Sequence, residues 1–332
     1  MALLDAPRFS LAQLPTPLVP ARRFSEALGG PAVWIKRDDL TGLATGGNKT
    51  RKLEYSLGKA LAEGATDLIT EGSIHSNHCR QTAAAACAAG LACHLALNAE
   101  SVPAIPQGNL LIDLLYGAQC HYVTTGPQRK TKMQDIADQL SADGRCPFII
   151  PTGASDETGC LGYAALALEL QHQLWSQSLT PDYVYTPSCS GGTHAGILLG
   201  KTWFGLEPPI RAVLAAGQAE EERRFIHDLT LRAASAASGP IELAMDNVQC
   251  DDSQVGPGYG IATEACLEAI QLLAQTEGIL LDPVYSGKAM AGLIADIREK
   301  RLNSGQSVVF IHTGGQMSLG GKVDQLQPLW HR

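Results

Sequence analysis

The sequence lacks any long run of basic residues. Among its 332 residues, 25 lysines and arginines stand against 33 aspartates and glutamates, which gives a formal net charge of −8. No stretch of lysine and arginine is longer than two residues, so the chain has no basic face suited to nucleic acid or to an anionic lipid surface. We therefore expect neither nucleic acid nor a membrane among its partners.

The sequence also lacks paired cysteines and an export signal. Its nine cysteines are an odd number, and no two of them have the short spacing that is typical of a zinc site. They fit reduced, buried thiols in a cytosolic protein, and we expect no metal. Asp5, Pro7 and Arg8 interrupt the segment in which a secretory signal would need apolar residues. These features predict a cytoplasmic location.

Features of disordered and membrane proteins are scarce as well. Hydrophobic residues make up 45% of the chain and charged residues 17%, and this balance excludes disorder, collagen and coiled coil. The uncharged stretch 183–200 contains threonine, serine and histidine side chains that would face lipid in a membrane span. We interpret it instead as a buried strand, a loop and a helix.

Short apolar runs alternate with helical patterns along nearly the whole chain, which is typical of a parallel sheet covered on both faces. The predicted fold class is α/β, and the length fits two domains. The first β-α-β unit is predicted as a strand at 66–70, a turn at 71–73, a helix at 77–90 and a strand at 92–97. The later predicted elements are helices at 110–116, 130–142, 193–199, 262–277 and 288–300, and strands at 120–124, 147–151, 183–186, 211–216 and 307–312.

Two glycine-containing segments could bind a ligand at a helix start. Gly46 and Gly47 precede a helical pattern that we expect Asn48 to cap. Because the helix dipole disfavours a cation in the first turn, Lys49 must be solvated, paired with an anion or neutralised covalently. The segment 190–193 joins an apolar strand to an apolar helix and would direct several backbone N–H groups at one phosphate, although a structural tight turn is the alternative.

A third segment, 73–80, is rich in hydroxyl, amide and imidazole donors. It follows a predicted strand, where open α/β sheets bind ligands, and its donors suit a carboxylate. Taken singly, His75 and His78 could equally be structural histidines, and tyrosines in turns such as Tyr259 and Tyr285 often serve packing. A lysine suited to covalent catalysis, a phosphate cradle and a carboxylate-binding turn together are what pyridoxal phosphate catalysis on an amino acid requires.

These motifs, in this order, resemble the pyridoxal phosphate family of D-cysteine desulfhydrase and 1-aminocyclopropane-1-carboxylate deaminase over nearly the whole chain. The matching segments are WIKRDD at 34–39, GGNKTRKLE at 46–54, SNH at 76–78, RQT at 80–82, SGGTHAG at 190–196, residues 278–293 and HTGG at 312–315. The resemblance implies the tryptophan-synthase-β-like fold (fold type II), with two open twisted parallel-sheet domains, the cofactor in the cleft, and a homodimer. It further implies a large cofactor-binding domain of residues 1–48 and 155–332 and a smaller inserted domain of residues 49–154.

The resemblance also implies a role for each site residue. Lys49 matches the lysine that binds the cofactor covalently and transfers the α-proton of the amino-acid substrate. The other matches are Asn48 in the same block, Lys52 near the phosphate, Ser190, Gly191, Gly192 and Thr193 in the phosphate loop, Asn77 beside the cofactor's phenolic oxygen, Ser76 at the substrate carboxylate with His75 and His78 in the same turn, Tyr259 and Tyr285 as the two active-site tyrosines, and Thr313 as partner of the pyridine nitrogen.

Two positions favour the desulfhydrase branch of this family. The deaminase has glutamate and leucine where this chain has Ser286 and Thr313. A carboxylate keeps the ring nitrogen protonated, whereas β-elimination with a good leaving group needs only a neutral partner. We therefore expect a lyase that converts D-cysteine to pyruvate, hydrogen sulfide and ammonia, with Lys49, Ser76, Tyr259 and Tyr285 as its catalytic residues.

Several alternatives stay open at this point. L-cysteate sulfo-lyase and 1-aminocyclopropane-1-carboxylate deaminase are the enzymatic alternatives, and a pyridoxal phosphate or amino-acid binding protein of the same fold is the non-enzymatic one. The chain departs from the family at His75, where glutamine is usual, at Cys189, where glycine is usual, and in the loop 152–156. Because His75 places a possible cation beside the carboxylate ligand, we hypothesise an altered or additionally anionic substrate.

Overall fold

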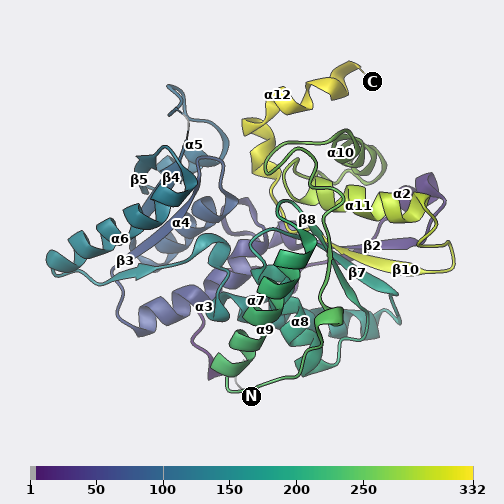
Figure 1. The fold of residues 1–332 in the computed structure, drawn as a ribbon, viewed down its shortest axis with the longest axis horizontal. Helices are drawn as coiled ribbons and strands as arrows, with labels where there is room; N and C mark the ends of the chain where they lie inside the picture. The colour runs from purple at the N-terminus through teal and green to yellow at the C-terminus, as the bar shows by residue number, and fades with distance from the viewer. Residues whose placement is uncertain (1–4, 100, 332) are drawn as a thin grey trace.

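The computed structural model describes residues 5–99 and 101–331, which form two β-sheets in two lobes (Figure 1). Residues 1–4, 100 and 332, which fall inside the predicted domain ranges, lie outside the described residues. The strands of the larger sheet, in spatial order, are β1 (Leu18–Pro20), β2 (Ala32–Lys36), β10 (Ser307–Ile311), β7 (Tyr183–Ser188), β8 (Ile210–Leu214) and β9 (Gln249–Asp251). Neighbouring strands pair in parallel, except that the edge strand β1 runs antiparallel to β2.

Helices cover both faces of the larger sheet (Figure 1). Those on one face are α7 (Glu157–Ser176), α8 (Gly192–Phe204) and α9 (Ala219–Ala236), and those on the other are α2 (Arg22–Leu28), α10 (Glu264–Glu277) and α11 (Ser286–Arg298). Strand β10 shows why both faces of the sheet must be covered by helices. Val309 and Ile311 pack on the α7 side, whereas Val308 and Phe310 pack on the α11 side, so the strand is apolar at successive positions.

The smaller sheet is entirely parallel within the described residues. Its strands, in spatial order, are β5 (Gln119–Val123), β4 (Ala92–Asn98), β3 (Asp67–Ser73) and β6 (Pro147–Ile149). Its helices are α3 (Asn48–Ala62), α4 (Asn77–Ala89), α5 (Gly108–Leu115) and α6 (Gly126–Ala142). Leu68 packs toward α3 and α4, and Ile69 packs toward α6, so this sheet is also covered on both faces. The remaining short elements near the C-terminus are η5 (Gln316–Gly321), α12 (Val323–Leu326) and η6 (Gln327–His331).

The predicted α/β alternation is confirmed, and the two errors near the site have physical reasons. The turn predicted at 71–73 is wrong, because Glu71 and Gly72 are buried and pair with β4, so strand β3 continues through Ser73. Asn48 does not cap α3. The N-cap is Gly47, with φ 124°, and the side chain of Asn48 turns away to bond Thr193. The predicted boundaries between the two domains stay a prediction.

None of the helices within the described part of the chain is both long and apolar enough to cross a membrane. This agrees with the interpretation of the stretch 183–200, which forms strand β7, a short loop and the first part of α8. The loop between them contains Ser190 and Gly191, and Gly192 begins α8, so the residues expected to form the anion cradle lie at this junction.

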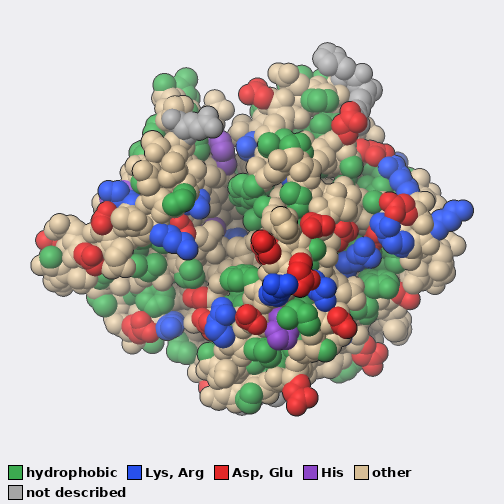
Figure 2. Space-filling view, in the orientation of Figure 1, with side chains coloured by type: hydrophobic (Ala, Val, Ile, Leu, Met, Phe, Trp, Pro, Cys, Tyr) green, Lys and Arg blue, Asp and Glu red, His purple; other side chains and the backbone are tan. Residues whose placement is uncertain are grey.

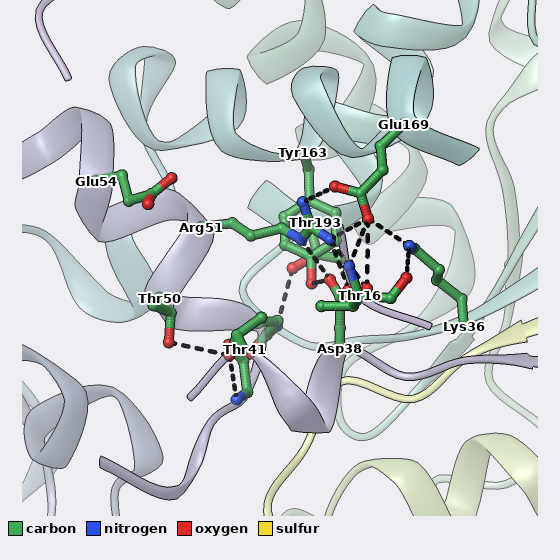
Figure 3. A network of polar contacts seen from close by, with 12 residues as sticks. Thr16, Lys36, Asp38, Thr41, Thr50, Arg51, Glu54, Tyr163, Glu169 and Thr193 are labelled. Carbon is green, nitrogen blue, oxygen red and sulfur yellow. Dashed lines mark hydrogen bonds and ion pairs between the residues drawn. The ribbon is translucent and has the colours of Figure 1, made fainter. Parts of the chain in front are cut away.

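A buried ionic network joins the start of α3 to the end of β2 and to α7 (Figure 3). The Arg51 guanidinium donates to both oxygens of Asp38, at 2.8 and 2.9 Å, and to both oxygens of Glu169 on α7, at 2.9 Å each. Lys36 pairs with Glu169, and the Tyr163 hydroxyl donates to Asp38 at 2.8 Å. Burial opposes ionisation of Asp38, but Arg51 holds the pKa of this carboxyl below its usual value. The network therefore fixes α3 against α7 and the end of β2.

Replacing Arg51 should be strongly destabilising. Arg51→Met would leave the buried carboxylates of Asp38 and Glu169 with less compensation, so we expect a loss of about 3–5 kcal/mol in the free energy of unfolding, measured by urea denaturation. Arg298→Met, which breaks the exposed pair with Glu268, should cost less than about 1 kcal/mol. Similar losses for the two variants would contradict the role given to the buried network.

Candidate active site

A cleft of about 840 Å³ lies between the two lobes, and the molecule is visibly hollowed there (Figure 2). It opens at the carboxyl ends of β3, β7 and β10, where parallel sheets commonly bind ligands. The predicted site residues that line it are Asn48, Lys49, His75, Ser76, Asn77, His78, Ser190, Gly191, Thr193, Tyr259, Tyr285 and Thr313. The two other predicted residues, Lys52 and Gly192, lie directly behind this lining. The cleft thus brings together segments from both sheets.

Helix α3 presents Lys49 to the cleft from its first turn. The helix is preceded by Gly46 and Gly47 at positive φ, and the Asn48 N–H donates to the carbonyl of Thr313 at 2.9 Å. The Asn48 side chain donates to Thr193 Oγ1 at 2.9 Å, so the start of α3 contacts both the end of β10 and the first turn of α8. Burial lowers the pKa of Lys49 to about 8, and this leaves a larger fraction of neutral amine at neutral pH than an ordinary lysine has.

Lys52 lies one turn further along α3 and is fully buried. Its ammonium donates to the carbonyl of Gly153 and to Ser155 Oγ, both at 3.0 Å, and it has no ion pair among the described residues. Burial, followed by repulsion from Lys49, lowers the pKa of Lys52 well below its usual value. A buried cation of this kind is stabilised by any anion that binds next to it.

The start of α8 provides a place for that anion. No side chain caps this helix among the described residues, its N-cap Gly191 has φ 73°, and the Ser190 hydroxyl lies 2.8 Å from that of Ser155. A Cβ at Gly192 would come within 2.8 Å of Lys52 Nζ, so the helix backbone and the ammonium approach the same point. Backbone N–H groups, hydroxyls and a buried cation together make a phosphate-sized anion site.

The turn before α4 supplies polar groups on the opposite wall. Ser76 is the N-cap of α4, and its hydroxyl accepts from the Cys79 N–H at 3.2 Å. His78 is buried, with Nε2 2.8 Å from Thr70 Oγ1, and burial lowers the pKa of its imidazole well below the usual value. His78 is therefore a neutral group at the floor of the cleft, and Ser76 and Asn77 are the more open residues of this turn.

Two tyrosines and a threonine complete the lining. The hydroxyls of Tyr259 and Tyr285 hydrogen-bond to each other, and burial raises the pKa of Tyr259 to about 12 and raises that of Tyr285 as well. Both phenols are protonated at neutral pH. Lys288 donates to the carbonyls of Val255 and Gly258, at 2.7 and 3.0 Å, and this holds the loop that carries Tyr259. Thr313 lies at the carboxyl end of β10 and is buried in the cleft wall.

The surroundings of His75 disfavour the positive charge that the sequence made possible there. Burial, and then the nearby Lys322, lowers the pKa of His75 below its usual value. The cleft lining also contains two basic side chains, Lys322 and Arg129, which sequence reasoning missed. Arg129 is bound to Glu71 at 3.1 Å and to Asn98 at 2.7 Å, whereas Lys322 has no ion pair among the described residues. Neither residue stands in a recognisable motif, so only the fold reveals them.

Cys189, the loop 152–156 and Ser286 lie at or close to the cleft. Cys189 lines the cleft beside the cradle, and Gly153 and Thr152 bring the loop 152–156 to the same wall. Ser286 lies behind Tyr285, where its hydroxyl donates to Asp282 at 2.6 Å. Within residues 5–99 and 101–331, no three histidine, cysteine, aspartate or glutamate side chains cluster in a way that would hold a metal ion.

Comparison with known proteins agrees with this geometry. A family model described as pyridoxal-phosphate dependent enzyme matches residues 9–314. The chain is 39% identical over 320 residues to the D-cysteine desulfhydrases of Salmonella choleraesuis (strain SC-B67) and Salmonella newport (strain SL254). These alignments cover 94% of this chain and 95% of each relative.

Solved structures show the same fold. An ACC deaminase homologue superposes with a TM-score of 0.88 at 34% identity, over 99% of this chain and 98% of its own. The processed form of threonine deaminase isoform 2 from Solanum lycopersicum gives a TM-score of 0.70 at 18% identity, over 99% and 86%, and supports the fold alone. The chain therefore belongs to the family of pyridoxal-phosphate dependent enzymes.

Proposed function

We propose that this protein is a lyase that eliminates the β-substituent of a small amino acid, with D-cysteine as the substrate. The products would be pyruvate, hydrogen sulfide and ammonia, with one water consumed. The observation that carries the proposal is the position of Lys49, which has a lowered pKa and lies between an anion cradle on one wall and the Ser76 turn on the other. The relatives named D-cysteine desulfhydrase support the choice of substrate.

The residues present fit pyridoxal phosphate. Its phosphate would take the cradle of Ser190, Gly191, Gly192 and Thr193, where it would compensate the buried ammonium of Lys52. Asn48 would hold the Thr193 hydroxyl in place through their 2.9 Å hydrogen bond. When bound at Lys49, the cofactor supplies an electron sink that stabilises negative charge at the substrate's α-carbon.

The side chains around Lys49 would bind the substrate and transfer its protons. The Ser76 hydroxyl would bind the substrate carboxylate at the start of α4, with His75, Asn77 and His78 in the same turn, and Asn77 would also lie beside the cofactor's phenolic oxygen. The Lys49 amine would remove the α-proton, because its lowered pKa makes it a base near neutral pH. The protonated hydroxyls of Tyr259 and Tyr285 would orient the substrate and donate to the departing thiolate.

The partner proposed for the cofactor's ring nitrogen favours elimination over ring opening. Thr313 offers a neutral hydroxyl in the cleft wall. The nearby carboxylate of Asp282 is fully engaged, since one oxygen accepts from the N–H groups of Val284 and Tyr285 and the other accepts from Ser286. A neutral partner suits a reaction in which the leaving group departs easily, and this supports a desulfhydrase rather than a deaminase.

The proposal also covers the location of the enzyme, its oligomeric state and its division into domains. We propose a cytoplasmic homodimer, with a large domain of residues 1–48 and 155–332 and a small domain of residues 49–154. All nine cysteines are free, which suits a reducing compartment. The smaller sheet is formed by strands within residues 67–149. In the sequence these residues fall between β2 and β7 of the larger sheet, and this supports an inserted domain.

A second candidate is elimination of sulfite from L-cysteate, a substrate with one more negative charge than cysteine. The observation that favours it is a pair of cationic side chains in the cleft lining, Arg129 and Lys322, of which Lys322 acts on His75. Arg129 is already paired with Glu71, so Lys322 is the cation available to a second anionic group.

The product of turnover separates these functions. Purified holoenzyme should release pyruvate from D-cysteine, and Lys49→Ala should reduce that rate at least about a thousandfold because it removes both the covalent site and the base. The measurement is a coupled keto-acid assay. Release of 2-oxobutyrate from the cyclopropane amino acid would favour the deaminase, and turnover that survives in Lys49→Ala would refute the proposed mechanism.

The lowered pKa of Lys49 can be measured directly. Without cofactor, burial disfavours the ammonium, so the neutral amine should appear as pH rises through about 8, the value expected for this group. Competitive acetylation at a series of pH values, read by peptide mass spectrometry, should give that midpoint for Lys49. A midpoint near the ordinary value of about 10.4 would contradict the burial of this amine.

The second candidate predicts a change in substrate ranking. Lys322→Gln should lower kcat/KM for L-cysteate by about twofold to fivefold relative to D-cysteine, since it removes one partly screened charge contact. His75→Gln provides the companion test of the turn itself. If neither substitution changes the ranking of the two substrates, the idea of an additional anionic group fails.

A further inference from the structure

The side-chain amide of Asn77 is held in one orientation by two buried neighbours. Its Oδ1 accepts from Arg80 Nη1 at 3.0 Å and from Asn109 Nδ2 at 2.9 Å. An amide oxygen has two lone pairs, so this acceptor is saturated. Because the oxygen is engaged away from the cleft that Asn77 lines, the NH2 group is the part of the amide left to face a ligand.

Each of the two neighbours is fixed in turn. Arg80 Nη1 also donates to Asn109 Oδ1 at 2.6 Å, and its Nη2 donates to the carbonyl of Gly46 at 3.2 Å. Asn109 Nδ2 also donates to the carbonyl of His75 at 2.6 Å. Both side chains are almost completely buried. The cluster therefore connects three segments, namely the loop before α3, the turn before α4 and the start of α5.

Burying the charged guanidinium of Arg80 costs free energy, because few groups compensate its charge. It has no ion pair among the described residues, and the acid that acts on it most, Asp113, is itself buried without a hydrogen-bond partner in the described part of the chain. Burial raises the pKa of Asp113 to about 8 although Arg80 opposes this. A guanidinium that carries so little compensation is a strong donor, and its acceptors are the amide oxygens and the Gly46 carbonyl.

We propose that Arg80 and Asn109 are positioning residues that lock Asn77 with its NH2 group toward the cofactor's phenolic oxygen. This inference rests on the proposed function, which places that oxygen beside Asn77. A hydrogen bond donated to the phenolic oxygen stabilises its negative charge. It thereby lowers the proton affinity of the nitrogen that would join Lys49 to the cofactor. Arg80 and Asn109, which we call the clamp, would thus adjust the charge state of the cofactor through Asn77, without touching the cofactor themselves.

The test is the pH dependence of the bound cofactor's visible absorbance. Asn77→Ala sets the full effect, which we expect to be an upward shift of the titration midpoint by about one pH unit. Asn109→Asp is nearly isosteric and keeps the contact to Arg80, but it places an acceptor 2.9 Å from Asn77 Oδ1 and turns the amide. We expect it to give at least half of the Asn77→Ala shift. Asn303→Asp is the matched control, because its Oδ1 already accepts from Gly305 in an exposed loop.

The outcomes separate the clamp from the proposed function. A shift in Asn77→Ala and Asn109→Asp, but not in Asn303→Asp, supports the proposal. A shift in Asn77→Ala with none in Asn109→Asp overturns the clamp and leaves the placement of Asn77 intact. No shift in Asn77→Ala overturns both. If Asn109→Asp does not bind cofactor, Arg80→Lys takes its place, and an unchanged midpoint in that variant overturns the proposal as well.

Discussion

The salt bridges of Arg51 to Asp38 and Glu169 are the interaction on which the site depends. They are buried and connect α3 to α7 and to the turn after β2, and Arg51 lies two residues beyond Lys49 (Figure 3). The helices can meet here because a Cβ at Gly162 would lie 2.2 Å from the carbonyl of Arg51, so only glycine permits this approach. The first turn of α3 is thereby fixed in direction and depth relative to both lobes.

The fixed position of α3 determines where its polar side chains lie relative to the cleft. Asn48, Lys49 and Lys52 occupy little more than one turn, which places an amide, an amine and an ammonium within reach of the α8 cradle. Burial lowers the pKa of both lysines, and the proposed function would offset this, with an anionic ligand beside Lys52 and a covalent bond at Lys49. On this proposal, binding of the family's cofactor would recover the stability lost by burying these groups.

The sequence predicted the parts of the fold that follow from local pattern. The apolar run at 183–200 predicted β7 and α8 correctly, since its strand and helix are both buried. Helices α7 and α9 were missed. Helix α7 is apolar around most of its circumference and shows no one-sided stripe. Helix α9 has a one-sided buried stripe, but three of its five residues are the small or polar Thr230, Ala233 and Ala234, and many charges surround it. The turn at 71–73 was wrongly predicted because the burial of Glu71 depends on Arg129, which is distant in sequence.

In the candidate site, too, features set by local sequence were predicted and features set by distant contacts were not. Motifs with glycines and hydroxyls at strand ends predicted the residues that line the cleft, because those residue types are needed locally for a turn and a cradle. Contacts between distant segments could not be predicted. Examples are the bond from Asn48 to Thr193, the cations Arg129 and Lys322, and the clamp formed by Arg80 and Asn109. Each of them depends on how the two lobes pack.

The most direct test of the account is to identify the lysine that bears the cofactor. Borohydride reduction of the holoenzyme would make the attachment permanent, and peptide mass spectrometry would then locate the added pyridoxyl mass. The account predicts this mass on Lys49 alone, with Lys52 unmodified one turn away. Modification of Lys52, or of a lysine outside the cleft, would contradict the assignment of the catalytic base and of the anion cradle together.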